Sequence, residues 1–139
     1  MFNKVLQFLP KRCILPLFWS ACLWVFVIGC HPKEYKALAP QAYKKALQSD
    51  SNCVLIDVRT RLEYREGHLK GAINIPYSGP GYGHKVDSLD TNLQVFVYCA
   101  TAHRSPMVVR SLRRRGFTHV FDLKGGYTAW RKKQLPYTR

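Results

Sequence analysis

The sequence predicts an α/β domain with an open, mainly parallel sheet flanked by helices. Nearly continuous aliphatic runs of strand length, such as residues 54–58 and 95–98, are typical of strands that are buried on both faces. Segments with helical start and stop signals alternate with these runs, which favours right-handed crossovers between parallel strands. The 139 residues, 47% of them hydrophobic, suit one domain with a core and argue against two domains or wholesale disorder.

Two helices are expected in the first half of this domain. Pro40 opens the first, because proline is favoured at the first helical position. Thr60 and Glu63 match a capping box that starts a short second helix, and Gly67 stands where that helix would end. The apolar residues of the first helix share one face, and they are Ala42, Ala46 and Leu47.

Two further helices and four strands complete the predicted order. Ser105 and Pro106 form an N-cap and N1 pair for a helix that runs to about residue 115, and a last helical segment covers residues 127–133. The glycines and prolines that follow Pro76 predict a long loop without an element of its own. The expected strands are residues 54–58, 72–75, 95–98 and 120–123.

The first 30 residues differ from the rest of the chain. Lys4, Lys11 and Arg12 precede an uncharged, apolar stretch over residues 13–29, which predicts a targeting segment and not a part of the fold. At about 1.5 Å per residue, such a stretch would reach roughly 26 Å as a helix, slightly less than the roughly 30 Å hydrocarbon core of a bilayer. A cleaved signal peptide and a membrane anchor over residues 1–29 both fit this length.

The end of this segment resembles a bacterial lipobox, which favours the first interpretation. The motif is Val27-Ile28-Gly29-Cys30, and the resemblance implies cleavage before Cys30, lipidation of Cys30, and a membrane-anchored protein that faces the periplasm or the cell exterior. The alternative is a signal anchor with an incidental cysteine, in either orientation, because basic residues also follow the apolar stretch. Residues 30–36 are then expected to form a polar tether and residues 37–136 the folded domain.

Cys99 is the candidate nucleophile. It directly follows a buried strand, so its sulfur is expected at the carboxyl edge of the sheet, where ligands of open α/β sheets bind. The next five residues are short enough to curl around the sulfur and direct backbone N–H groups at it. The helix N-terminus and the Arg104 cation both favour the thiolate, which predicts a pKa below the ordinary value of about 8.5. The candidate anion-binding residues are Ala100, Thr101, Ala102, His103 and Arg104.

Four ordered motifs resemble the rhodanese family of sulfurtransferases. They comprise residues 55–59 with 63–64, residues 67–76, residues 97–99 with 104–105, and residues 125–130, and the likeness spans roughly residues 35–135. The resemblance implies a rhodanese-like fold and an enzyme without a cofactor. Cys99 would take a sulfur atom from thiosulfate or a similar donor as a persulfide and pass it to a thiophilic acceptor, a thiol or cyanide. Arg104 would hold the charged oxygens of the donor and stabilise the persulfide.

Two features distinguish this loop from those of relatives. Many family loops carry glycine where this chain has Ala102, and a residue with a Cβ atom resists positive φ. Related phosphatases of this fold place five residues between cysteine and arginine, whereas four separate Cys99 from Arg104, so a shorter loop would enclose a sulfur and not a phosphoryl group. A phosphatase is therefore the less favoured enzyme. The main alternative to an enzyme is a persulfide carrier or docking module that turns over poorly with small molecules.

The remaining polar residues are interpreted as structural. Asp57 interrupts an apolar run and needs a partner such as Arg59 or loop amides, so both are expected to support the site from below. The cysteines and histidines lack ligand spacing, and no metal is predicted. The formal net charge of +14 raises nucleic acid as a partner, but the predicted membrane location favours anionic lipid or an acidic partner. His103 is either a second cation at the site or a solvated loop residue.

Overall fold

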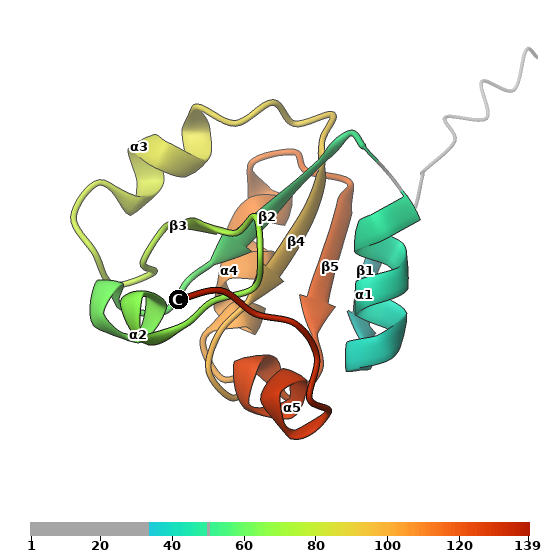
Figure 1. Cartoon of the computed structure of the whole chain (residues 1–139). Helices are drawn as coiled ribbons and strands as arrows, with labels where there is room; N and C mark the ends of the chain where they lie inside the picture. The colour runs from blue at the N-terminus through green and yellow to red at the C-terminus, as the bar shows by residue number, and fades with distance from the viewer. Residues whose placement is uncertain (1–33, 50) are drawn as a thin grey trace, which may run out of the picture. The chain divides into compact units, whose positions relative to one another are not determined.

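The computed structural model describes residues 34–49 and 51–139, which form a parallel sheet with helices on both faces (Figure 1). The strands are β1 (Glu34–Leu38), β2 (Cys53–Asp57), β3 (Ile73–Asn74), β4 (Gln94–Tyr98) and β5 (His119–Leu123). The helices are α1 (Pro40–Ser49), α2 (Arg61–Glu66), α3 (Tyr82–Asp87), α4 (Ser105–Arg114) and α5 (Gly126–Lys132). The predicted targeting segment, the lipidation site Cys30 and the first residues of the tether lie outside the described residues.

The five strands follow the order β1-β5-β4-β2-β3, and every neighbouring pair is parallel. This arrangement confirms the predicted open α/β sheet. The aliphatic residues of β2 and β4 are buried because helices cover both faces, as continuous apolar runs of strand length indicate. All five strands therefore end at the same edge of the sheet.

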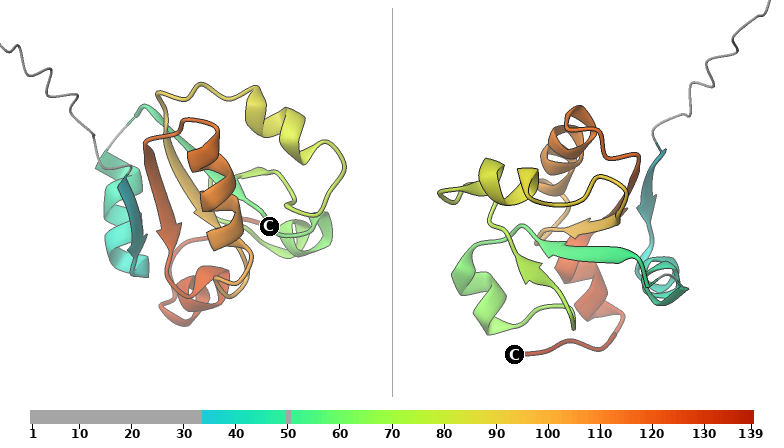
Figure 2. Two further views of the ribbon diagram at one scale, coloured as in Figure 1. Left: turned by 180° about the vertical axis from the view of Figure 1, so that it is seen from behind. Right: turned by 90° about the horizontal axis from the view of Figure 1, so that it is seen from above.

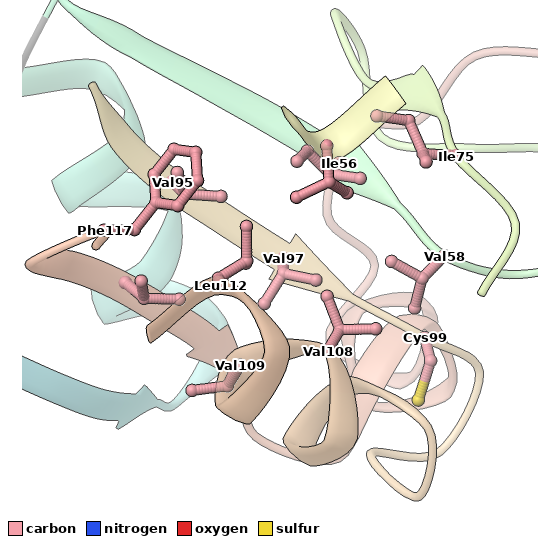
Figure 3. Packing of buried hydrophobic residues seen from close by; sticks show 12 residues of the cluster. Ile56, Val58, Ile75, Val95, Val97, Cys99, Val108, Val109, Leu112 and Phe117 are labelled. Atoms are coloured by element: carbon pink, nitrogen blue, oxygen red, sulfur yellow. The ribbon is translucent and has the colours of Figure 1, made fainter. Parts of the chain in front are cut away.

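Two apolar clusters fill the space between the sheet and the helices. Helices α3 and α4 cover one face, and α1 and α5 cover the other (Figure 2). On the α4 face, the buried side chains include Val97, Val108 and Leu112, as Figure 3 shows. On the α1 face, Tyr43 contacts Phe96 edge to face with ring centroids 5.3 Å apart, and Trp130 completes the cluster. The sheet is thereby fixed from both sides close to its carboxyl edge.

Two elements differ from the prediction. Residues 34–36, which the sequence assigned to the tether, belong to β1, an edge strand that pairs only with β5. An edge strand needs no continuous apolar run, so its charged residues concealed it. Helix α3 occupies part of the predicted loop, although Gly83 lies within it. Most of the breakers precede the helix, Gly81 is its N-cap with φ of 74°, and Val86 anchors it in the core at 1% exposure.

The boundaries of other helices follow the sequence signals closely. Thr60 caps α2 through a complete capping box with Glu63, and Gly67 is the C-cap, which confirms this prediction. In α4 the cap lies one residue earlier than expected: Arg104 is the N-cap and Ser105 is the first helical residue. The Ser105 side chain is consequently free for another contact, described below.

Residues beyond the predicted domain end at residue 136 also contact the domain. Thr138 and His68 exchange two backbone hydrogen bonds, each 2.8 Å long, as an isolated antiparallel bridge. The Trp130 indole N–H donates to the Pro136 carbonyl over 2.9 Å. In the described part of the chain, none of the helices has the length and apolar character needed to cross a membrane.

Candidate active site

Cys99 lies at the carboxyl end of β4, between the sheet and the first turn of α4. It is one of two cysteines among the described residues, neither of which is in a disulfide, and Figure 3 shows it at the edge of the apolar cluster beside Val58 and Val108. Only 1% of the residue is exposed. Cys53 starts β2 at the opposite end of the sheet, so no disulfide joins the two. Cys99 is therefore largely shielded from solvent at the carboxyl edge of the sheet.

Donors around the sulfur favour the thiolate. Burial raises the pKa of Cys99, but hydrogen bonds from the Ser105 hydroxyl and from the backbone N–H groups of Ser105, Arg104 and Thr101 lower it. The lowering is larger than the effect of burial, so the net shift of the pKa is downward. The Sγ–Oγ distance between Cys99 and Ser105 is 3.5 Å. This is the physical basis of an activated cysteine: a thiolate in a shell of fixed donors at a helix N-terminus.

The start of α5 shapes the loop around Cys99. The Tyr127 N–H donates to the Cys99 carbonyl over 2.8 Å, and the Thr128 N–H donates to the Ala100 carbonyl over 2.9 Å. These bonds turn the loop carbonyls toward α5 and leave the loop amides free to face the sulfur. Gly126 permits the approach, because a Cβ atom there would lie 2.4 Å from the Cys99 carbonyl oxygen.

Ala102 adopts the left-handed conformation that the loop requires. Its φ is 63°, which is one of two positive values at non-glycine residues in the described chain. The loop thus keeps the backbone shape that glycine would favour, at a conformational cost of about 1–2 kcal/mol. The other loop residues are more exposed: Thr101 and His103 contact each other, with 2.8 Å between Oγ1 and Nδ1.

The Arg104 guanidinium is held by a carboxylate from α2. Its two terminal nitrogens donate to the two Glu63 oxygens over 3.0 and 2.8 Å, and both side chains are about one third exposed. Hydrogen bonding from Arg104 lowers the pKa of Glu63 to about 2, with further hydrogen bonds from Thr60 acting in the same direction. Arg104 therefore connects the loop to α2, and the Glu63 carboxylate neutralises its positive charge.

A buried ion pair supports the site from the sheet. Asp57 accepts the backbone N–H of Arg59 over 2.9 Å and its guanidinium over 2.6–3.0 Å, so the two residues expected to support the site are direct partners. The same guanidinium donates to the Gly67 carbonyl and lies 4.0 Å from the ring centroid of Tyr127. Arg59 thus links the end of β2 to the residue that orients the Cys99 carbonyl.

Two of the five predicted loop residues, Thr101 and Arg104, donate backbone hydrogen bonds to the Cys99 sulfur. The structure adds three residues to the site that the sequence did not indicate as site residues. The sequence predicts Ser105 as a helix cap, Glu63 as half of a capping box, and Tyr127 as the first residue of the last helical segment. A polar residue directly after the loop arginine is the one sequence signal that pointed to Ser105. Within residues 34–49 and 51–139, no cluster of His, Cys, Asp or Glu is placed to hold a metal ion.

The family model for the rhodanese-like domain matches residues 39–133. The chain belongs to the rhodanese-like family. This confirms the resemblance and the fold predicted for it. Thiosulfate sulfurtransferase 16 of Arabidopsis thaliana is 37% identical over 91 residues, which cover 58% of this chain and 76% of that protein. The putative sulfur carrier protein YrkF of Bacillus subtilis is 28% identical over 109 residues, covering 76% of this chain and 58% of that protein.

Solved structures show the same rhodanese-like fold. A rhodanese-related protein from Thermoplasma volcanium superposes with a TM-score of 0.66 at 25% identity, covering 75% of this chain and 98% of that one. The chain spans less than two thirds of the length of the Bacillus subtilis relatives that it matches. Relatives of this domain thus include proteins named as sulfurtransferases and as sulfur carriers.

Proposed function

We propose that this protein is a sulfurtransferase that moves a sulfane sulfur from thiosulfate or a similar donor to a thiophilic acceptor through a Cys99 persulfide. The observation that carries this proposal is the place of Cys99 at the carboxyl end of β4, with its sulfur 3.5 Å from the Ser105 hydroxyl oxygen at the start of α4; the hydrogen-bond donors there lower the pKa of Cys99. A lowered pKa increases the thiolate fraction at neutral pH, the thiolate is the nucleophile, and a covalent intermediate divides the transfer into two easier steps.

The first step needs no external oxidant or proton donor. The Cys99 thiolate attacks the outer sulfur of thiosulfate, the sulfur–sulfur bond of the donor breaks, and sulfite leaves with the electron pair. The new persulfide carries the same single negative charge as the thiolate, so the amides that stabilise one also stabilise the other. An acceptor thiolate or cyanide then attacks the outer sulfur and restores Cys99.

The decisive experiment combines activity with mass spectrometry on the full chain. Thiosulfate should load one sulfur atom on the peptide that contains Cys99, and cyanide should remove it as thiocyanate with steady-state turnover. The Cys99→Ser variant should lose both, and Cys53→Ser, which removes the other described cysteine, should retain both. A wild-type chain that takes up no sulfur would overturn the proposal.

A persulfide carrier is the second candidate. The name of the relative YrkF and the 1% exposure of Cys99 favour it, because a shielded persulfide is protected from small acceptors. A carrier would take up sulfur on Cys99 but release it to cyanide at a negligible rate. Hydrolysis of aryl phosphates that depends on Cys99, without any sulfur uptake, would instead assign a phosphatase.

We further propose that the protein acts at the cell envelope, anchored through a lipid on Cys30. The support is the lipobox-like motif at residues 27–30 after an apolar stretch. Cys30→Ala should leave an unprocessed precursor, whereas Cys22→Ala, which changes another cysteine of the same segment, should not. An unchanged mass and unchanged membrane partitioning of the Cys30 variant would refute the lipid anchor.

A further inference from the structure

The Glu63–Arg104 ion pair joins the start of α2 to the loop that follows Cys99. Both terminal nitrogens of Arg104 are engaged by the two Glu63 oxygens in a bidentate arrangement. Glu63 is itself held at the start of α2, because its Oε2 accepts from the Thr60 N–H over 2.8 Å and from the Thr60 hydroxyl over 2.9 Å. The carboxylate is therefore a fixed group that faces the loop, and not a mobile surface charge.

The second arginine near the site is neutralised as well. Arg59 is 4% exposed and forms an ion pair with the fully buried Asp57. The cationic groups next to Cys99 thus each carry an anionic partner, and the net attraction for a donor comes from loop amides and the α4 N-terminus. Loop amides stabilise one negative charge, whereas a second charge on a sulfur donor held by Arg104 would lie beside Glu63, whose carboxylate binds the same guanidinium.

The Glu63 side chain carries its negative charge across the neutral pH range. Because the hydrogen bonds from Arg104 hold the pKa of Glu63 at about 2, this carboxylate stays ionised throughout the neutral range. The negative charge of Glu63 therefore does not change with pH in this range, and a substitution is needed to remove it.

We propose that Glu63 is a specificity-determining residue, which lowers the efficiency of dianionic donors and favours sulfane sulfur carried by a singly charged or neutral group, such as an organic thiosulfonate or a thiol persulfide. This inference rests on the proposed sulfur transfer and refines its donor class. With a thiosulfonate, the Cys99 thiolate attacks the outer sulfur, the donor S–S bond breaks, and a sulfinate anion leaves with the electron pair.

Two donors of similar size isolate the effect of charge. Thiosulfate is a dianion, and methanethiosulfonate replaces one of its charged oxygens with a methyl group and is a monoanion. The measured quantity is the ratio of kcat/KM for the two donors, on the full chain with cyanide as acceptor. A variant that is partly unfolded lowers both values equally, so the ratio reports specificity alone.

The test variant is Glu63→Gln, and Glu66→Gln is its matched control. Glutamine at the third position of α2 keeps the capping box, so the helix start is preserved. Glu66 is an exposed residue of the same helix, and its substitution removes the same charge without a change at Arg104. We expect Glu63→Gln to shift the ratio toward thiosulfate by about fivefold or more, and Glu66→Gln to leave it within about twofold.

The outcomes separate this inference from the proposed function. A ratio that is unchanged in Glu63→Gln, or that shifts toward methanethiosulfonate, would overturn the role of Glu63 while sulfur transfer stands. An equal shift in both variants would assign the effect to overall charge and would also overturn it. If the wild-type chain accepts sulfur from neither donor, the proposed function itself fails.

Discussion

Cys99 combines two properties that usually oppose each other. Burial favours the neutral thiol, yet the Ser105 hydroxyl and three backbone N–H groups hold the net pKa below that of a free cysteine. A buried thiol without such donors would be inert. The reactivity of this residue therefore depends on fixed donors and not on access to solvent.

The pH profile of Cys99 alkylation tests this balance. The thiolate fraction rises as pH increases through the pKa, so a lowered pKa places the midpoint of the rate profile below that of a free cysteine measured in parallel. Iodoacetamide labelling, followed on the Cys99 peptide by mass spectrometry, measures it; slow absolute rates do not move the midpoint. Ser105→Ala should raise the midpoint, and Ser111→Ala, on the same helix, should not. A profile like that of free cysteine would contradict the assignment.

Ala102 stores strain in the loop. Its φ of 63° is costly for a residue with a Cβ atom, so Ala102→Gly should stabilise the fold by about 1 kcal/mol. Urea unfolding measures the change. Ala100→Gly is the control with the opposite sign, because Ala100 lacks a positive φ and should lose about 0.5–1 kcal/mol. Destabilisation by Ala102→Gly would show that the alanine conformation is not strained.

At the scale of elements, the sequence predicted those whose signals are local. The capping box of α2 and the aliphatic runs of β2 and β4 depend on neighbouring residues, and the structure confirms them. The contact between Glu63 and Arg104 joins residues that are 41 positions apart, so no local pattern indicates it. The same limit concealed β1, whose charged residues suit an edge strand as well as a tether.

The ion pair between α2 and the loop after Cys99 should make the stability of the protein depend on pH in the acid range. Glu63 has its pKa lowered from 4.5 to about 2, so its contribution to stability is complete above pH 4.5 and is lost as pH falls toward 2. Glu63→Gln should therefore lower the free energy of unfolding by about 1 kcal/mol near neutral pH, and the difference from wild type should vanish near pH 2. Urea unfolding across pH measures this.

Glu66→Gln again provides the comparison, since an exposed charge outside any close pair should change stability by less than about 0.5 kcal/mol at every pH. A Glu63→Gln deficit that remains constant down to pH 2 would attribute the loss to packing and not to the ion pair.

At the scale of the whole domain, the chain end holds the turn after α2. Thr138 both donates to and accepts from His68, and the adjacent Gly67 carbonyl accepts from Arg59. The last residues therefore act on the same network that supports Cys99. The sequence predicts a domain end at residue 136, since an isolated bridge such as that between His68 and Thr138 has no periodic signal.

Thr138→Pro tests how much the backbone bridge between Thr138 and His68 contributes to stability. Proline removes the N–H that donates to the His68 carbonyl, and the expected loss is about 1–2 kcal/mol in urea unfolding, with faster hydrogen exchange at the His68 amide. Thr138→Ala keeps the backbone bonds and should be close to wild type. Equal stability of the two variants would show that the bridge contributes nothing.

The place of β1 beside β5 also has a consequence for the order of folding. Glu34, near the start of the domain, pairs with His119, near its end. During synthesis the ribosome delivers β1 first, yet its neighbour in the sheet emerges almost last. Strands β2, β3 and β4 can pair with one another before β5 is synthesised. Strand β1 can join the sheet only after β5, so the pairing of this edge strand is expected to be a late step of folding.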